Sequence, residues 1–346
     1  MEIPGNLKRA IRTFRDRLDD GLYHVEHDID MDGFASGIIT TVALRRMGFD
    51  AHPYATERDK CFVPEKGALV FTDIALDGEP VEIVQGASKS GRNVYAIDHH
   101  PWRKDVEKKL HAYVNPHFTD VPSPSQWNTG FLAYLTFREL VSDYDWLAAI
   151  SIYTDHCIAP WNEFLIQRFG YDKVKRAGDL LSAYIAVIED LSELDYILLN
   201  DIHSLNDVLS RSEFIDAENK FEGTVKKYVE DPKEQAVIWD ERRKIIVRVT
   251  EEKYRQINSI VSTRVSTLPE YRDWIVIVLG MDRNGTLKGS FRCQEWEKRG
   301  IHLGELAKRI AVTLGGEGGG HPMAAGMRIP NGNLNSVLSV INEVIK

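Results

Sequence analysis

The sequence predicts an α/β protein in which a doubly wound, mostly parallel sheet is joined by a helical connector to a smaller α/β domain. In the first 160 residues, short apolar runs alternate with helix-like patterns, which is typical of βαβ units. From about 170 to 229 the pattern becomes helical and charged, and a second alternating segment begins near Gln235. The 346 residues suit two domains better than one core. We therefore expect a first domain at 1–200, a helical connector at 201–232 and a second domain at 233–346.

The elements of the first domain follow from short apolar runs and from helical spacing. The predicted strands are Leu22–His27, Ala68–Thr72, Val94–Ile97 and His111–Val114. The predicted helices are Phe34–Met47, Val81–Ser88 and Gly130–Val141. In parallel sheets the ligands bind at the carboxyl ends of the strands. The polar residues that directly follow each strand are therefore the first candidates for a functional site.

The second half repeats the alternation on a smaller scale. Leu205–Val229 is expected to be a solvated helical connector. The strands predicted after it are Ile245–Val249, Trp274–Leu279 and Leu287–Cys293. The predicted helices are Glu251–Val265, Leu303–Leu314 and Leu334–Ile345. A glycine-rich stretch and a short strand separate the last two helices.

Composition excludes several protein classes. Hydrophobic residues make up 43% and charged residues 27%, the balance of an ordinary globular protein. No apolar run reaches the roughly 18 residues that a membrane span needs, and residues 1–20 lack the apolar core of a signal peptide. Cys61, Cys157 and Cys293 are odd in number and widely spaced, so a disulfide framework is not expected. We expect a cytoplasmic protein with reduced thiols and no membrane partner.

Charge is distributed unevenly along the chain. The net charge of −9 by itself argues against a nucleic-acid partner. Residues 233–346, however, contain 18 Lys and Arg against 13 Asp and Glu, a net charge of +5, and the remainder has a net charge of −14. This asymmetry fits a metal-binding half joined to a phosphate-binding half, although a chance imbalance would look the same.

The first predicted strand runs into an acidic cluster. Asp28, Asp30 and Asp32 occupy alternate positions before Gly33, and this crowding of like charges raises carboxylate pKa values unless a cation binds. A calcium loop would need a Glu at its twelfth position between two helices, but that position is Ile39 and a strand precedes the cluster. For this motif alone, a solvated acidic turn remains the alternative.

Three further apolar segments end in the same way. Thr72 is followed by Asp73, Ile97 by Asp98-His99-His100, and Thr154 by Asp155-His156. Mixed imidazole and carboxylate ligands favour manganese, zinc, iron or cobalt over calcium. Two ions about 3.5–4 Å apart would activate a water and stabilise the leaving oxygen of an in-line phosphoryl displacement. Asp73, alone at its strand end, is the predicted bridging ligand.

These motifs resemble those of the DHH phosphoesterase superfamily. Asp28-Ile29-Asp30-Met31-Asp32-Gly33 is similar to the first motif of the family, Asp73 to the second, Asp98-His99-His100 to the third and Asp155 to the fourth, and Asn115-Pro116-His117 resembles its Asn-Pro turn. The resemblance implies one ion on Asp28, Asp30 and Asp73, and a second on Asp32, Asp73, His99 and Asp155. It implies that His100 contacts the scissile phosphate and that Asp98 orients a histidine.

A glycine cluster follows near the C-terminus. Gly315–Gly326 is more often the composition of a flexible loop, but this stretch also carries His321 and Ala324-Ala325. It is not a Walker loop, because no Gly-Lys-Ser/Thr follows. The stretch resembles the glycine-histidine signature of the DHHA1 domain, and Gly289–Cys293 resembles that domain's Ser-x-Arg strand. The resemblance implies substrate binding in a cleft between the domains. The residues implied are Arg292, Gly318, Gly319, Gly320 and His321.

The predicted activity is metal-dependent hydrolysis of a phosphodiester, with two divalent ions, manganese first and magnesium or cobalt as alternatives. The DHHA1 resemblance points away from pyrophosphate. The aspartate-rich first motif and Pro122–Thr129 look more like RecJ than like the nanoRNases, and the length lacks room for a bacterial OB-fold domain. The closest resemblance is to compact archaeal RecJ-like nucleases of replication or repair. It implies a single-strand exonuclease of 3′–5′ polarity on DNA or RNA, with replication or repair proteins as possible partners.

Three alternatives stay open. An oligoribonuclease of the nanoRNase kind and a cyclic-dinucleotide phosphodiesterase would use the same metal chemistry on smaller substrates. A non-catalytic replication scaffold, as in the Cdc45 branch of the superfamily, would have lost metal ligands, whereas the ligand set is complete in this sequence. Metal content near two ions per chain would separate an enzyme from a scaffold.

Overall fold

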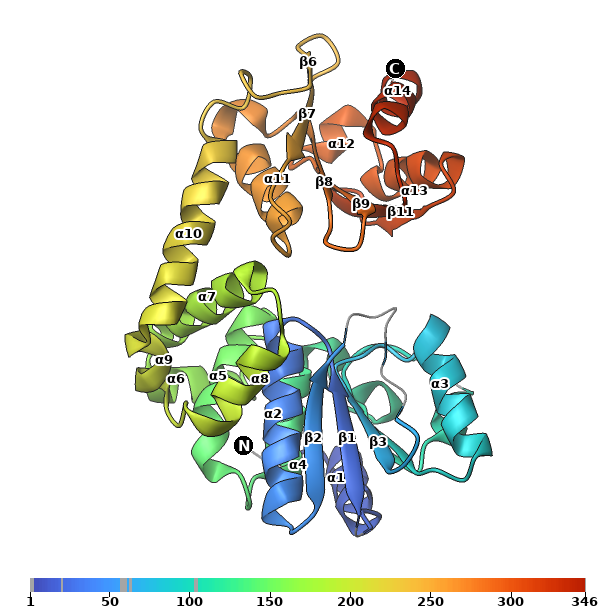
Figure 1. Cartoon of the computed structure of the whole chain (residues 1–346), viewed down its shortest axis with the longest axis vertical. Helices are drawn as coiled ribbons and strands as arrows, with labels where there is room; N and C mark the ends of the chain where they lie inside the picture. Colours follow the sequence, from blue (N-terminus) through green and yellow to red (C-terminus); the bar gives the residue numbers. More distant parts are fainter. Residues whose placement is uncertain (1–2, 20, 57–60, 62–63, 103–104, 346) are drawn as a thin grey trace. The chain divides into compact units, whose positions relative to one another are not determined.

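The computed structural model describes residues 3–19, 21–56, 61, 64–102 and 105–345. Its chain divides into two compact units, Met1–Glu218 and Asn219–Lys346 (Figure 1). The division falls within the long helix α10 (Ser212–Val229), inside the segment expected to be the connector. Within the described residues, no helix is both long and apolar enough to cross a membrane.

The first unit is built on a five-stranded parallel sheet with the strand order β2-β1-β3-β4-β5. Its strands are β1 (Leu22–His27), β2 (Asp50–Ala55), β3 (Ala68–Thr72), β4 (Val94–Ile97) and β5 (Ala112–Val114). The order reverses direction between β1 and β3, because β2 lies on one side of β1 and every later strand lies on the other. A doubly wound sheet binds its ligands at such a reversal, outside the carboxyl ends of the strands.

Side chains alternate between two apolar layers along these strands. Leu69 and Phe71 of β3 pack on the face covered by α3 (Gly78–Lys89), whereas Val70 packs into the larger cluster on the opposite face. Each face is therefore buried, as a parallel sheet requires. The helices of the larger layer include α1 (Gly5–Asp16), α2 (Met31–Arg46), α4 (Thr129–Phe137), α5 (Asp145–Thr154), α6 (Glu163–Phe169), α7 (Tyr171–Val187), α8 (Ser192–Asn200) and α9 (Leu205–Ser210).

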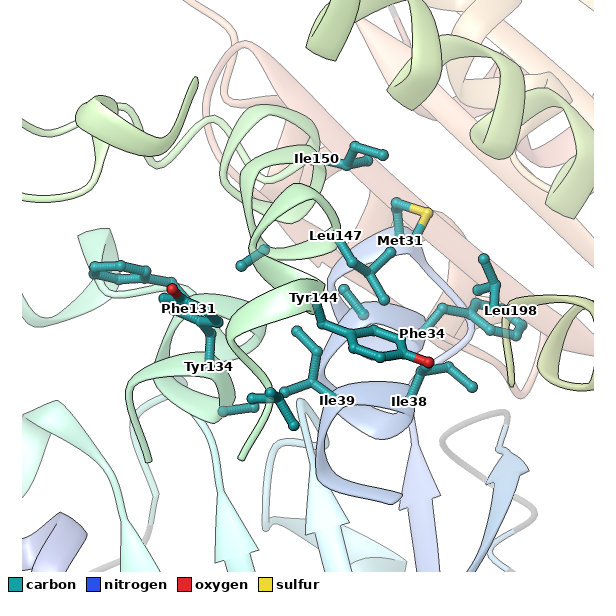
Figure 2. Close-up of a cluster of buried hydrophobic side chains, with 14 of the residues drawn as sticks. Met31, Phe34, Ile38, Ile39, Phe131, Tyr134, Tyr144, Leu147, Ile150 and Leu198 are labelled. Carbon is teal, nitrogen blue, oxygen red and sulfur yellow. The ribbon is translucent and has the colours of Figure 1, made fainter. Parts of the chain in front are cut away.

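Helix α2 is the centre of this layer. All of its residues from Met31 to Leu44 are buried, and it packs against α4, α5 and β2. Figure 2 shows Met31, Phe34 and Ile38 of this helix among the side chains of α4, α5 and α8. A helix buried on all sides has little freedom to shift. The residues at its N-terminus are therefore held in fixed positions at the carboxyl edge of the sheet.

The sequence prediction missed some elements and misassigned one. Helix α1 and strand β2 were not expected. The fourth apolar segment, which precedes Asp155, was expected to end like a strand, and this expectation was wrong, because Asp145–Thr154 is the buried helix α5. A short, fully apolar run does not distinguish a buried strand from a buried helix. The connector was also not simply solvated, because α10 buries Phe214, Phe221 and Val225.

The second unit has a six-stranded mixed sheet with the order β10-β11-β9-β8-β7-β6, in which only β7 and β8 pair in parallel. Its strands are β6 (Ile238–Asp240), β7 (Ile245–Thr250), β8 (Ile275–Met281), β9 (Thr286–Arg292), β10 (Glu317–Gly320) and β11 (Ala324–Pro330). Its helices are α11 (Ile257–Thr267), α12 (Trp296–Arg299), α13 (Leu303–Thr313) and α14 (Leu334–Val344). Helix α11 contacts β8 and β9, whereas α13 and α14 cover the core on the other face.

The glycine run forms strand β10 at the edge of this sheet, where it pairs with β11 and packs against α13. A Cβ atom on Gly318 would lie 2.5 Å from the carbonyl oxygen of Ala307 in α13, closer than side chains come in real structures. A Cβ atom on Gly319 would meet nothing within 4 Å. Alternate glycines of the run therefore have different roles, and Gly318 is required by helix packing.

We expect Gly318→Ala to lower the free energy of unfolding by about 1–3 kcal/mol, because α13 must move away from β10. The matched variant Gly319→Ala should change it by less than about 0.5 kcal/mol. Denaturant unfolding followed by circular dichroism measures both. Equal effects of the two variants would contradict the packing explanation.

Candidate metal centre

The candidate metal centre lies at the carboxyl edge of the first sheet. Asp28, Asp30 and Asp32 follow β1, and Asp73 follows β3, so they flank the point where the strand order reverses. The segment 98–100 follows the neighbouring strand β4. Asp155 reaches the same edge from the C-terminus of α5.

Hydrogen bonds from backbone amides to two of its aspartates hold the turn after β1. Asp30 is the N-cap of α2, and its carboxylate accepts a hydrogen bond of 3.0 Å from the amide of Gly33. The carboxylate of Asp28 accepts a 2.7 Å hydrogen bond from the amide of Ile29. A Cβ atom on Gly33 would lie 2.2 Å from the carbonyl oxygen of Asp28, so the motif needs glycine there. This turn fixes where the aspartates lie.

Asp32 is buried and binds the N-terminus of α4. Its Oδ1 accepts hydrogen bonds from Asn128 Nδ2 and the amide of Gly130, both at 2.7 Å, and its Oδ2 accepts one from the amide of Thr129 at 2.8 Å. A carboxylate has about four acceptor positions, so one position on Oδ2 remains for a metal. Asn128, Thr129 and Gly130 were not predicted as site residues. An Asn before an apolar helix is the signal that could have identified them.

Asp73 contacts site residues from both α4 and the segment after β4. It is buried and adopts a left-handed backbone conformation with φ of 60°, which Asp tolerates better than most residues. Its Oδ1 accepts a 2.8 Å hydrogen bond from Thr129 Oγ1 and lies 3.6 Å from His99 Nε2. The charge of Asp30 also acts on Asp73 and helps to raise its pKa. This central position is the one expected of a bridging ligand.

A backbone carbonyl orients the ring of His99. Its Nδ1 donates a 3.1 Å hydrogen bond to the carbonyl oxygen of Ser125, which leaves the Nε2 lone pair free. That Nε2 lies between Asp73, at 3.6 Å, and Asp155, at 3.7 Å. A backbone carbonyl that fixes the tautomer of a histidine in this way is typical of metal sites. Ser125 carries no sequence signal, because only its carbonyl oxygen takes part.

Asp98 positions His100. Its Oδ1 accepts hydrogen bonds from His100 Nδ1 at 2.7 Å and from the amides of His99 and His100, and its Oδ2 accepts one from Trp102 Nε1. These four hydrogen bonds use the acceptor positions of the Asp98 carboxylate. Burial lowers the pKa of His100, but the hydrogen bond and charge of Asp98 outweigh it and raise the pKa to about 9. His100 is half-exposed, and its Nδ1 is held by Asp98.

The other acids repel one another. Burial and the charge of Asp30 raise the pKa of Asp28 to about 6, and burial and the charge of Asp32 raise the pKa of Asp155 to about 6. Burial and the same neighbouring carboxylates raise the pKa of Asp30 and, further still, of Asp73. In the described part of the chain, no Lys or Arg forms an ion pair with these four carboxylates. Divalent cations would relieve this repulsion.

Two groups of side chains could hold an ion. One is Asp73, His99 and His100, and the other is His99, Asp155 and Cys157, with the ligand atoms of each group within 4.8 Å of one another. The carboxylate and imidazole donors fit manganese or a similar divalent metal. Cys157 was not anticipated as part of the site. Its thiol donates to Asp155 Oδ2 at 2.9 Å, and burial raises its pKa.

A buried histidine, His27, contacts both the first motif and helix α8. His27 Nε2 and Asp195 Oδ1 on α8 lie 2.9 Å apart, and His27 Nδ1 lies 2.8 Å from the carbonyl oxygen of Asp28. Burial opposes protonation, but the charge of Asp195 outweighs it and raises the pKa of His27. The pair ties α8 to the end of β1. It was not predicted, because its partners are 168 residues apart.

The residues predicted to bind substrate lie in the second unit. Arg292 at the end of β9 donates to Thr263 Oγ1 at 3.1 Å, to Ser259 Oγ at 2.8 Å and to the carbonyl oxygens of Phe291 and Ala325. Four of its five N–H groups are used, so one is left for a ligand. His321 is exposed in the turn after Gly318–Gly320. Both residues flank β11, one through β9 and one through the turn that leads into it.

Two family models match the chain. The DHH family N-terminal domain matches residues 23–156, and the DHHA1 domain matches residues 243–346. The first match contains all of the acids and histidines of the candidate metal centre, and the second contains Arg292 and the glycine run.

Similar proteins agree with these matches. An uncharacterized protein of Methanocaldococcus jannaschii is 34% identical over 73 residues, which are 21% of this chain and 22% of that relative. The crystal structure of an exonuclease RecJ bound to manganese has 20% identity and a TM-score of 0.71 over 99% of this chain and 94% of its own. The DHH domain of a protein described as a member of a family of ribosomal proteins has 18% identity and a TM-score of 0.70, over 98% and 91%. At these identities the structures establish the fold.

The raised pKa values predict a pH dependence of the metal-free protein. The folded pKa of Asp28 and of Asp155 is about 6 against an ordinary 3.8, so the folded state binds more protons than the unfolded state between these values. The two carboxyl groups therefore contribute most to the free energy of unfolding below about pH 3.8, and this contribution is lost as the pH rises through 6. With chelator, we expect the free energy of unfolding to fall from pH 5 to pH 7, by on the order of 1 kcal/mol per carboxylate. Manganese should restore it at pH 7.

Asp73→Asn should stabilise the chelated protein at pH 7 and weaken the response to manganese. Asp143→Asn is the control of opposite sign, because the hydrogen bond with Arg46 lowers the pKa of Asp143. Thermal unfolding of the three proteins with chelator and with manganese tests this. Two results together would rule out repulsion among the site carboxylates. The chelated wild type would become more stable from pH 5 to pH 7, and Asp73→Asn would not raise the unfolding temperature of the chelated protein.

Proposed function

The chain belongs to the DHH/DHHA1 phosphoesterase family, and on that basis we propose that it is a manganese-dependent exonuclease that hydrolyses single-stranded DNA or RNA from the 3′ end. The observation that supports this most directly is the position of His99 Nε2 between Asp73 and Asp155, among carboxylates that have no Lys or Arg partner in the described part of the chain. The fold shared with a RecJ exonuclease bound to manganese supports the choice of metal and of substrate class.

The ligand sets that we propose are those implied by the DHH motifs. Asp28, Asp30 and Asp73 would hold one ion, and Asp32, Asp73, His99 and Asp155 would hold the other. Two such ions would neutralise the phosphate and lower the pKa of an attacking water. Asp32 would contribute only Oδ2, because Asn128 and Gly130 already bind its Oδ1.

His100 is proposed to bind the scissile phosphate. Its Nδ1 is held by Asp98, and the hydrogen bond and charge of Asp98 outweigh burial and raise the pKa of His100 to about 9. The Nε2–H can then donate a charge-assisted hydrogen bond to a phosphate oxygen. Asp98 would act through His100 rather than as a metal ligand.

The second unit is proposed to hold the substrate. Its residues 233–346 are net positive in a chain that is net negative. Arg292 retains one N–H, on Nη2, for a phosphate. To bind a phosphate with two parallel hydrogen bonds, it would also need to release an N–H of Nε or Nη1 from its present acceptor. Gly319 and His321 would approach the same ligand, since a Cβ atom on Gly319 would point into open space.

The form of the substrate tests the proposed function. With manganese, we expect linear single-stranded DNA or RNA labelled at the 5′ end to give a shortening ladder, whereas circular single strands should resist, because an exonuclease needs an end. Asp73→Ala should fold and lose at least about a thousandfold in turnover, roughly 4 kcal/mol in the barrier. Asp143→Ala should remain active.

Efficient cutting of circles would refute the exonuclease assignment. A preference for di- to tetranucleotides over 20-mers would favour an oligoribonuclease. A folded protein that holds no metal and has no manganese-dependent activity would favour a scaffold.

Arg292 tests the role of the second unit. We expect Arg292→Ala to weaken single-strand binding about ten- to a hundredfold, the loss of a charge-assisted hydrogen bond, without loss of metal. Arg264→Ala, also in the second unit but paired with Glu222, is the matched control. Affinity is measured with calcium to prevent cleavage, together with metal content and stability. Unchanged affinity with lost metal would mean that this motif has another function.

A further inference from the structure

The first unit has a groove of about 340 Å³ beside β5, the last strand of its sheet. Helix α1 forms one side of the groove with Arg9 and Thr13, and Arg17 follows at its end. The segment from Glu107 to Thr119 forms the other side. All residues that line it belong to the first unit, and none of them belongs to the proposed metal ligands.

Two cations at this groove, Arg9 and Arg17, have no acidic partner among the residues that the structure describes. Among the described residues, none forms an ion pair with Arg9 or Arg17, and the only hydrogen bond of the Arg17 side chain is a 2.6 Å bond from Nη1 to the carbonyl oxygen of His111. Arg15 of the same helix, by contrast, pairs with Glu139 at 3.1 Å. Lys8 and Arg12 of α1 are also exposed and unpaired among these residues. Unpaired cations in an otherwise acidic unit attract a polyanion.

Aromatic side chains line the same groove. Tyr113 and Phe118 are half-buried, with ring centroids 5.5 Å apart in an edge-to-face arrangement. Thr13 and Thr119 add hydroxyl groups, and Glu107 is the one acid among the lining residues. Cations combined with an aromatic surface are typical of single-strand binding, because phosphates meet the cations and a base stacks on a ring. The volume suits a nucleotide unit rather than a duplex.

The groove is connected to the metal centre through one short segment. Phe118 and Thr119 line the groove, and Asn115, four residues before Thr119, donates a 2.9 Å hydrogen bond from Nδ2 to the carbonyl oxygen of His100. Four residues span at most about 14 Å. His117, between them, lies 3.4 Å from Ser125 Oγ, and the carbonyl oxygen of Ser125 holds His99.

We propose that this groove binds the phosphates of a single-stranded nucleic acid a few nucleotides away from the end that is hydrolysed. The proposal rests on the proposed nuclease function and adds a second contact site for long substrates. An acidic protein segment is the competing occupant, but the aromatic rings and the short connection to His100 favour nucleic acid.

The test compares 4-mers and 20-mers of single-stranded DNA and RNA, with binding measured in calcium and turnover in manganese. Arg9→Ala/Arg17→Ala should weaken 20-mer binding at least about tenfold and leave 4-mer binding and turnover unchanged. The salt slope of 20-mer binding should fall by about 1.4, since each lost phosphate contact contributes about 0.7. Arg15→Ala is the matched control. Arg9→Glu, at an exposed side chain without hydrogen bonds to the described protein, covers the case in which the double variant fails to fold.

Several outcomes would overturn the groove site. If the variants bind 20-mers as the wild type does, or lose 4-mers and 20-mers equally, the groove does not hold the distal strand. If they bind 20-mers normally but lose binding of a polyglutamate peptide, the groove is a protein site. These results leave the nuclease function intact. A wild type that neither binds nor cleaves any oligonucleotide would refute both proposals.

Discussion

The repulsion among buried carboxylates is the constraint on which the rest of the first unit depends. Asp28, Asp30 and Asp73 lie at one edge of the sheet with raised pKa values and with no Lys or Arg partner in the described part of the chain. Such an arrangement survives only if the surrounding backbone holds it in place. The buried helix α2 and the turn closed by Gly33 do so on one side, and the N-terminus of α4 does so on the other.

The N-terminus of α4 links two of these acids. The amides of Thr129 and Gly130 bind Asp32, and the hydroxyl of Thr129 binds Asp73. A helix N-terminus favours negative charge, so it compensates part of the repulsion without adding a basic side chain that would compete with a metal. His99 and His100 are fixed by different partners, a backbone carbonyl and Asp98, which suits one to bind a metal and the other a phosphate.

Much of this arrangement could be predicted from the sequence. The acids and histidines stand directly after apolar runs, and a parallel sheet brings the ends of such runs together. Asp155 was predicted for the site although its element was wrongly expected to be a strand, because the residue type and its place after an apolar run are common to both cases. Ser125, Thr129 and Asp195 were missed, because they act through backbone atoms, a short hydroxyl or a distant pairing. The groove beside β5 could not be foreseen either, since helix α1 was not predicted.

The interleaved glycines of β10 bear on how the motif should be compared between relatives. Gly318 and Gly320 lie against backbone atoms of neighbouring elements, whereas Gly319 lies in open space. Packing therefore constrains Gly318 and Gly320 but does not constrain Gly319. A relative that keeps glycine at 318 and 320 but varies at 319 would preserve the packing of β10. An alignment that scores the three positions together would hide this difference in structural constraint.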